Sequence, residues 1–473
     1  MSRTDTDVVI LGGGPVGCLL SVLLGDAGVR SAVVERDAQP YSLPRAIVMD
    51  DEIQRVLRLH GMGGFLDDRT EPMVAADFVD ADGATVIGLD IPATGLLGLP
   101  PVVVHYQPEL DAMLRREVEA RGADARWGRT VADVREDGDG VVTSLDDGSE
   151  IRSRWFVGCD GASSWTRKRF GLSLDDLQFD QDWVVVDVEL HEDASVDLPR
   201  GVRQYCEPAR PSTYVKGVRR FRRWEFQVQP GEVPADLATD QALWSLLSRW
   251  LTPRDARLVR SATYRFHAVV APTMRAGRAF LAGDAAHQMP PFAGQGLNSG
   301  MRDAVNLAWK MGLVSSGCAG DALLDSYSVE RVPHVRRTVA SSVDMGRLID
   351  QIAGHVSHGV GVDAGYGGDA QQPFLEDGLV VHGDPRAGRQ FWHHVGVEQA
   401  SLRRGGSFVV VAGSDDAAVP PSLGALPTEL VVAPEAANGA FAVVVRPDLF
   451  VAGVAVDQGG LDAIGRAIAS RAR

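Results

Sequence analysis

A glycine cluster directly after an apolar run limits the possible folds of this chain more than any other feature. The run, Asp7-Val-Val-Ile-Leu11, is typical of a short buried parallel strand, and the cluster is Gly12-Gly-Gly14-Pro-Val-Gly17. Residues 16–26 then have helical spacing, and Ser31-Ala-Val-Val-Glu35 predicts a second strand. The chain therefore opens with a strand–helix–strand unit, which indicates the α/β fold class.

The three spaced glycines of this cluster match a dinucleotide-binding turn. Gly12 permits the tight turn, Gly14 lets the backbone approach a pyrophosphate, and Gly17 allows the helix to pack closely on the strand. Free N–H groups at the helix start attract phosphates. Glu35, followed by Arg36, ends the second strand, where a carboxylate can accept hydrogen bonds from both ribose hydroxyls. An acid there favours FAD or NAD over NADP; a glycine-rich turn without a ligand is the alternative.

A later apolar run leads into a second candidate ligand site. Arg278-Ala-Phe-Leu-Ala282 precedes Gly283-Asp284, and ligands of open α/β sheets collect at the carboxyl ends of parallel strands. The segment Pro290-Pro291 with Gly294-Gln-Gly296 then brings rigid, bare backbone near a flat ligand. A helix that begins near Asn298 points unpaired N–H groups and partial positive charge at that ligand. A reduced flavin carries negative charge at its N1–C2 carbonyl edge, so this segment suits a flavin.

A second copy of the glycine pattern, Gly359-Val-Gly361-Val-Asp-Ala364, is predicted to be part of a linker. No apolar strand precedes it, and the glycines at 365, 367 and 368 disfavour a following helix. The sequence therefore predicts one dinucleotide site, not separate domains for FAD and NAD(P)H.

Composition excludes several classes of function. A formal net charge of -16 repels polyanions, which argues against binding of nucleic acid and of anionic membranes. The four cysteines are widely scattered, and neither a metal site nor a dithiol centre is expected. The apolar N-terminal stretch is preceded by Asp5 and Asp7 and interrupted by glycines, unlike a signal peptide. We expect a soluble, cytoplasmic protein without a membrane-spanning segment.

Alternating apolar and polar residues at 183–189 and 212–229 predict antiparallel strands inserted into the nucleotide-binding domain. The predicted boundaries are an FAD-binding domain at 1–180, with some substrate-domain strands near 72–104, an inserted β-sheet substrate domain at 181–267, and the second part of the FAD-binding domain with helices at 268–353. Residues 354–473 are predicted to form a linker and a small α/β module, with strands at 407–412, 429–432 and 441–445 and a helix at 461–471.

Three motifs together resemble the signatures of the class A flavoprotein aromatic hydroxylases: Gly12 to Gly17, Asp160-Gly161 and Gly283-Asp284. The stretches Leu43 to Glu52 and Met289 to Lys310 are most similar to the 3-(3-hydroxyphenyl)propionate hydroxylase and phenol hydroxylase branch. The last hundred residues resemble the thioredoxin-like tail of phenol hydroxylases in outline. The resemblance implies a Rossmann-like FAD-binding domain, an inserted antiparallel sheet that binds substrate, and a C-terminal thioredoxin-like α/β module.

The resemblance also implies an activity. It is the hydroxylation of a small phenolic or aromatic substrate by O2, through a flavin C4a-hydroperoxide, with FAD as cofactor and NADPH or NADH as a transient co-substrate. No metal or covalent nucleophile is needed. A homodimer is left open.

By the same resemblance, most candidate site residues belong to FAD. Arg45 and Pro291 would also position the flavin for catalysis, Arg167 is a weaker candidate, and Tyr205 and Tyr214 on the inserted sheet are candidate substrate contacts. The cofactor-binding set is Gly12, Gly14, Gly17, Glu35, Arg36, Arg45, Gln107, Asp160, Asp284, Pro291, Gly294, Gly296, Leu297 and Asn298.

Alternatives remain for single residues and for the function. Arg45 could be a surface partner of Asp50 or Glu52, Gln107 could simply open a helix, and His287 is predicted to be structural rather than an acid or base. Epoxidation or Baeyer–Villiger oxygenation uses the same scaffold, because fold alone does not select the reaction. A flavin-binding sensor or interaction protein without turnover is the alternative from another class.

Overall fold

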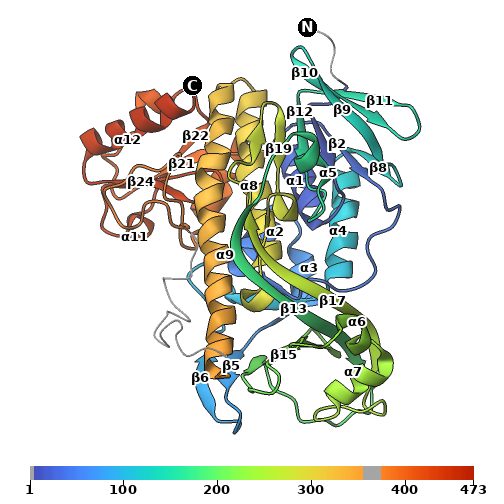
Figure 1. Cartoon of the computed structure of the whole chain (residues 1–473). Coiled ribbons are helices and arrows are strands. Elements are labelled where there is room, and N and C mark those ends of the chain that lie inside the picture. Colours follow the sequence, from blue (N-terminus) through green and yellow to red (C-terminus); the bar gives the residue numbers. More distant parts are fainter. Residues whose placement is uncertain (1–4, 355–373) are drawn as a thin grey trace.

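The computed structural model describes residues 5–354 and 374–473 (Figure 1). Its central sheet has the order β18-β19-β12-β1-β2-β8, and all neighbouring strands are parallel except the pair β18 and β19. The strands are β1 (Val8–Leu11), β2 (Ser31–Glu35), β8 (Asp124–Trp127), β12 (Trp155–Gly158), β18 (Arg275–Ala276) and β19 (Ala279–Leu281). The predicted strand–helix–strand opening is present, with α1 at Pro15–Asp26.

Side chains along each short strand point alternately to the two faces of this sheet, and each face is covered by a different part of the protein. Val8 and Ile10 of β1 face the main core, where α1 packs against α4 (Gln107–Ala120) and α8 (Gln295–Ser315). Val9 faces the opposite side, in a cluster with Val134 and Val141 of a three-stranded antiparallel sheet that the sequence analysis did not predict. That sheet consists of β9 (Val131–Asp137), β10 (Gly140–Leu145) and β11 (Glu150–Ser153).

The predicted antiparallel sheet is larger than expected and has the order β20-β17-β13-β16-β15-β14-β5-β6. Its long strands β13 (Asp175–Leu190) and β17 (Ala256–Val270) pair with each other and run from the central domain into the inserted part (Figure 1). The other strands are β5 (Ala75–Val79), β6 (Thr85–Asp90), β14 (Val202–Tyr205), β15 (Ser212–Lys216), β16 (Phe221–Gln227) and β20 (His287–Gln288). Strand β5 pairs with β14, so residues before the insertion complete this sheet.

The two faces of the eight-stranded sheet have different partners. Val186 and Trp224 belong to an outer cluster that packs under α7 (Asp240–Leu247). Trp183 and Val185 belong to the main core, which also contains Phe292. We call the Trp183 side the inner face, because it is turned toward the central domain.

The C-terminal module is built around the mixed sheet β22-β21-β23-β24. Phe408, Val410 and Val444 of this sheet share the main core with Trp309 of α8, so the module is not an independent unit. Its likeness to thioredoxin stays a prediction. The elements are β21 (Phe408–Ala412), β22 (Thr428–Val432), β23 (Ala442–Val445), β24 (Val451–Ala455), α10 (Val395–Ser401), α11 (Pro434–Ala437) and α12 (Gln458–Arg471). The second glycine pattern at 359–364 lies outside the described residues.

The remaining elements connect these parts. The longest helix, α9 (Ser326–Ile352), stands beside α8 and between the central sheet and the C-terminal module (Figure 1). The others are β3 (Val48–Asp50), β4 (Thr70–Pro72), β7 (Val102–His105), α2 (Asp51–Leu59), α3 (Gly63–Arg69), α5 (Trp165–Arg169) and α6 (Pro234–Leu237). Within residues 5–354 and 374–473, no helix has the length and apolar character needed to span a membrane.

Candidate active site

Strand register brings the three sequence motifs to one edge of the central sheet. Leu11 of β1 lies beside Gly158 of β12, and Gly158 lies beside Leu281 of β19. Because these strands are parallel, the loops that follow them leave the sheet at the same height. The glycine turn, the Asp160 loop and the Asp284 loop are therefore neighbours.

The glycine turn is closely packed on one side and open on the other. Gly12 has φ +109°, and a Cβ there would lie 2.3 Å from the Cys159 carbonyl oxygen. A Cβ at Gly17 would lie 2.0 Å from the Gly12 oxygen, so the helix start sits directly on the turn. A Cβ at Gly14 would meet nothing within 4 Å, and no side chain caps the start of α1. Free N–H groups thus face open space, which is what a phosphate requires.

Glu35 is placed at this turn as predicted. Its Oε2 accepts a 2.7 Å hydrogen bond from the Gly13 N–H, and its Oε1 accepts one of 2.8 Å from Asp37 N–H. The carboxylate is half-buried and rigid. Arg36 is different, since its side chain is 80% exposed and pairs with Asp37 at 3.8 Å. Arg36 lies at the rim.

Asp284 carries the one free carboxylate among the three loops. Its side chain makes no hydrogen bond with any residue that the structure describes, although it stands in the 3-10 turn Gly283–Ala285. The side chain is accessible, yet protein surrounds it, so it lies in a recess. Desolvation there raises the pKa of Asp284 above its ordinary value, and the charges of His287 and Arg45 oppose that shift.

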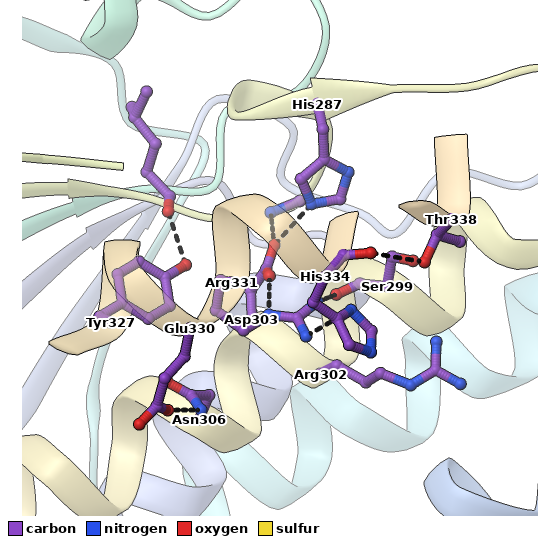
Figure 2. Close-up of polar contacts among 12 residues, drawn as sticks. His287, Ser299, Arg302, Asp303, Asn306, Tyr327, Glu330, Arg331, His334 and Thr338 are labelled. Carbon is purple, nitrogen blue, oxygen red and sulfur yellow. Dashed lines mark hydrogen bonds and ion pairs between the residues drawn. The ribbon is translucent and has the colours of Figure 1, made fainter. Parts of the chain in front are cut away.

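A buried network of hydrogen bonds and ion pairs holds the Asp284 loop in place (Figure 2). Asp303 of α8 accepts hydrogen bonds from the Gly283 N–H (2.9 Å) and from Arg331 Nε (2.7 Å), and its Oδ2 lies 2.7 Å from His287 Nε2. Burial alone would raise the pKa of Asp303, but His287 and Arg331 lower it below its ordinary value. His287 is 1% exposed and points into this network, which agrees with the structural role expected for it.

The Asp160 loop is held by its own side chains. Asp160 accepts hydrogen bonds from Ser164 Oγ (2.6 Å) and from Thr166 N–H (2.9 Å), and thereby fixes the start of α5. Arg167 donates to Ala285 O at 2.9 Å and to Ala162 O at 3.0 Å. Arg167 therefore ties this loop to the Asp284 loop.

The segment from Pro291 to Asn298 leads into α8, whose first turns pack against Gly283 and against Val16 of α1. Gly294 has φ +63°, and a Cβ there would lie 2.2 Å from Val48 Cγ2. Helix α8 starts without a side-chain cap, and a Cβ at Gly296 would meet nothing within 4 Å. Leu297 is partly buried beside it. Asn298 is buried, accepting from Asp50 N–H (3.2 Å) and donating to Gly294 O (3.0 Å), so its side chain holds the helix start in place.

Arg45 and Gln107 meet at a residue that the sequence analysis missed. Gln107 is the first residue of α4; its Oε1 accepts from the Ala46 N–H (2.6 Å) and its Nε2 donates to Asp111 (3.3 Å). Arg45 is half-exposed with Nη2 3.9 Å from Asp111 Oδ2. Its partner is therefore Asp111, and not Asp50 or Glu52. The signal for Asp111 was available, because it follows Gln107 by one helical turn.

The two tyrosines proposed as substrate contacts are not brought to this site. Tyr205 and Tyr214 both belong to the outer cluster of the eight-stranded sheet, with Trp224 and Leu247. Tyr205 accepts a hydrogen bond from Trp250 Nε1 (3.1 Å), and the Tyr214 ring packs edge-on against Trp224. The strand register turns both side chains away from the three loops, and a role of these tyrosines in substrate contact stays a prediction.

Comparison with known proteins identifies the family. Residues 5–342 match the family described as FAD binding domain. The chain belongs to this FAD-binding family. A relative with 38% identity over 352 residues is the probable NADH-specific resorcinol 4-hydroxylase of Rhodococcus jostii (strain RHA1), matched over 73% of this chain and 66% of the relative. A second relative is the 3-(3-hydroxy-phenyl)propionate/3-hydroxycinnamic acid hydroxylase of Mycobacterium sp. (strain JLS). It is 38% identical, and the match covers 75% of this chain and 62% of the relative. The matched region spans less than two thirds of these relatives.

Solved structures confirm the fold of this FAD-binding family member along the whole chain. Aklavinone-11 hydroxylase in complex with FAD and aklavinone superposes with a TM-score of 0.85 at 22% identity, covering 99% of this chain and all of that one. The p-nitrophenol 4-monooxygenase of Pseudomonas putida DLL-E4 has a TM-score of 0.66 at 25% identity, over 74% and 89% of the two chains. The family match and the 38% identical relatives confirm the predicted resemblance to flavin hydroxylases and the prediction of an FAD-binding chain.

The residues at the recess fit FAD. The open helix start at Gly14 provides free N–H groups for a pyrophosphate, and Glu35 stands beside it where an adenosine ribose would follow. Asp284 offers a carboxylate with no partner among the described residues, suited to hydroxyl groups of a ribityl chain. The uncapped start of α8 at Gly296 suits the electron-rich edge of the flavin.

Proposed function

We propose that this protein is an FAD-dependent monooxygenase that adds one hydroxyl group to a phenolic ring, using NAD(P)H and O2. The observation that carries the proposal is the recess where two uncapped helix starts and the free Asp284 carboxylate converge. Relatives named for resorcinol and for 3-(3-hydroxy-phenyl)propionate support a phenol as substrate. The name of the first supports NADH as the reductant.

In this proposal the glycine turn, Glu35 and Asp284 bind the cofactor, and the Arg45 loop and Pro291 turn orient its ring. Bound FAD supplies hydride acceptance from NAD(P)H and the activation of O2. The other residues of the proposed FAD set are Arg36, Gln107, Asp160, Gly294, Gly296, Leu297 and Asn298, of which Gln107, Asp160 and Asn298 act by fixing the backbone around the recess.

The substrate is proposed to bind on the inner face of the eight-stranded sheet, beside the place where the Pro291 turn packs against it. Trp183 and Phe266 of that face pack edge-on against Phe292 of the turn, with ring centroids 5.3 and 5.9 Å apart. An apolar aromatic wall suits a flat ring and keeps water away from it. The proposed domains follow from this arrangement: FAD-binding at 1–180 and 268–353, substrate-binding at 181–267, with a linker and C-terminal module at 354–473. A cytoplasmic location and a homodimer stay predictions.

The experiment is a screen of FAD-loaded enzyme against a panel of phenols led by resorcinol, with NADH and NADPH in parallel. We expect slow NAD(P)H oxidation alone, acceleration by the correct phenol, and a hydroxylated ring in the product. A product with an expanded ring would indicate Baeyer–Villiger oxygenation, and an epoxide would indicate epoxidation. Absence of turnover with every member of the panel would support the sensor alternative and contradict the proposal.

A further inference from the structure

The inner face of the eight-stranded sheet carries a glutamate that neither the family motifs nor the site described above use. In strand β16, Glu225 pairs with Val185 of β13 on one side and Thr213 of β15 on the other. Arg223 and Gln227, two residues away in each direction, point to the same face, while Trp224 and Phe226 point to the outer cluster. Glu225 is therefore turned toward the central domain.

The neighbours of Glu225 anchor its strand to the Arg45 loop on one side and to α9 on the other. Arg223 donates to Arg45 O (2.6 Å) and Pro44 O (3.3 Å), which lie in the Arg45 loop. Gln227 donates to Asp350 of α9 at 3.3 Å and pairs across the sheet with Trp183, which contacts the Pro291 turn through Phe292. Glu225 lies between these two anchor points, on the face to which the substrate is proposed to bind.

The Glu225 carboxylate has no hydrogen bond with any described residue, although only 6% of the residue is exposed. Its nearest cation is Arg223, 3.9 Å away, and that guanidinium already donates to Asp187 at 2.7 and 2.9 Å. Burial raises the pKa of Glu225 to about 7; Arg223 opposes the shift and Asp187 adds to it. A buried carboxyl without a hydrogen bond is costly, and it is satisfied when a ligand supplies a donor.

We propose that Glu225 accepts the proton of the substrate's phenolic hydroxyl group. The inference rests on the proposed function and deepens it. The phenolic O–H bond breaks, its electron pair stays on the phenolate oxygen, and a new O–H bond forms on the Glu225 carboxylate. No electron is transferred in this step. The phenolate ring is richer in electrons and attacks an electrophilic oxygen more readily. After hydroxylation the product oxygen takes the same proton back, so that Glu225 is ionised again.

The proposal predicts how substrate binding depends on pH. Ionised Glu225 accepts a strong hydrogen bond from a phenol, so affinity rises as pH increases through about 7. The charges that act on Glu225 are those of Arg223 on its own strand and Asp187 on β13. Arg260 on β17 pairs with Asp187, Asp350 on α9 accepts from Gln227, and the facing loop contributes the Arg45 carbonyl group. The arginines stay charged in this range, so the expected change comes from Glu225.

The test uses the FAD-loaded full chain and the phenol that is turned over fastest in the panel led by resorcinol, together with the ether in which every phenolic hydroxyl group of that compound is methylated. Binding is followed by the change in flavin absorbance from about pH 6 to about pH 8. For the phenol we expect affinity to rise about ten-fold across this range, since hydrogen bonds to charged groups are the strong ones. The methyl ether has no proton to give, and its affinity should not change with pH.

Glu225→Gln keeps the shape of the side chain but removes the carboxylate that accepts the proton. We expect this variant to retain its FAD content and melting temperature, to bind the phenol without pH dependence, and to release more hydrogen peroxide per NAD(P)H instead of hydroxylated product. Glu207→Gln is the matched control, because Glu207 pairs with Arg249 on the outer side of the sheet. It should behave as the unaltered enzyme does.

Two results would overturn the inference while leaving the proposed function intact. One is a Glu225→Gln enzyme that keeps both the pH dependence of phenol binding and the full product yield. The other is equal pH dependence for the phenol and its methyl ether in the unaltered enzyme, which decides the question even if the variant fails to fold. An unaltered enzyme that turns over no phenol would overturn the proposed function and this inference with it.

Discussion

At the scale of single residues, the glycines of the first turn differ in what an added side chain would meet. Gly17 faces the backbone of the turn itself, with a Cβ only 2.0 Å from the Gly12 oxygen, while Gly14 faces open space. Gly14 also has φ -75° and ψ -178°, which any residue adopts. Gly17 is thus needed for the fold, and Gly14 leaves room for the ligand.

Gly14→Val should therefore fold and yet lose FAD, because its branched side chain fills the space in front of the free N–H groups. Gly17→Val should misfold or lose much of its stability, since neither backbone segment can move away. The measurement is the flavin absorbance per chain together with the melting temperature. A yellow Gly14→Val protein with a full complement of FAD would contradict the assignment of this turn.

Asp284→Ala should weaken FAD binding by about ten-fold or more, since a carboxylate that accepts from ribityl hydroxyls contributes on the order of 1.5–3 kcal/mol. The apoprotein should be no less stable, because the carboxylate has no partner among the described residues and its pKa is raised by desolvation. Titration of apoprotein with FAD gives the affinity, and urea unfolding gives the stability. Asp160→Asn is the contrasting variant: its carboxylate holds Ser164 and Thr166, so stability should fall. Unchanged FAD affinity in Asp284→Ala would remove Asp284 from the site.

At the scale of elements, buried charges join α8, α9 and the C-terminal module. Glu330 of α9 accepts hydrogen bonds from Lys310 of α8 (2.7 Å) and, at 2.9 and 2.8 Å, from Arg446, which follows β23. Arg446 also donates to Asp448, which accepts from Trp309 Nε1 at 3.0 Å. All these side chains are almost inaccessible to solvent. The module is therefore attached by ion pairs as well as by its apolar core.

Glu330→Gln should lower the free energy of unfolding by about 3–5 kcal/mol, because it leaves two buried cations without a full countercharge. Burial would raise the pKa of Glu330, but Arg446 and Lys310 lower it to about 2, below the ordinary 4.5. The unfolded state thus binds the proton more tightly, and this stabilisation is present above about pH 4.5 and is lost as pH falls toward 2. Urea unfolding of both proteins at neutral and acidic pH measures it. Exposed Glu192→Gln is the control. A loss below about 0.5 kcal/mol would contradict the role of Glu330.

A helix or strand can be predicted from its own sequence when its pattern of apolar and polar residues is enough to show which side chains are buried. Strands β1, β2 and β19 of the central sheet and the start of α1 are of this kind, and their predicted bounds agree with the structure within one or two residues. The bounds of helix α9 were not predicted, because it contains Pro333 and buries Glu330, Arg331 and His334. Glu330 and Arg331 are stabilised by partners on other elements, and His334 contacts Arg331 within the helix. The sheet face on which Tyr205 and Tyr214 lie was not predicted for a related reason, because it depends on strand register rather than on composition.

At the scale of the whole molecule, the C-terminal module completes the main core. Removal of everything after Ala353 would expose the side of α8 that packs on Phe408 and Val444 and would leave Lys310 and Glu330 without Arg446. We expect the truncated protein to aggregate or to melt at a much lower temperature, measured by thermal unfolding and the soluble fraction. A soluble truncation with unchanged stability would show that the module is dispensable.

The most direct test of the central claim follows the oxygen atom. FAD-loaded enzyme is supplied with 18-oxygen gas, NADH and the phenol that stimulates NADH oxidation, and the product is examined by mass spectrometry. We predict a hydroxylated phenol that carries one labelled oxygen atom from the gas, with about one NADH consumed per product formed. A product whose new oxygen comes from water, or NADH oxidation that yields only hydrogen peroxide with every phenol, would contradict it.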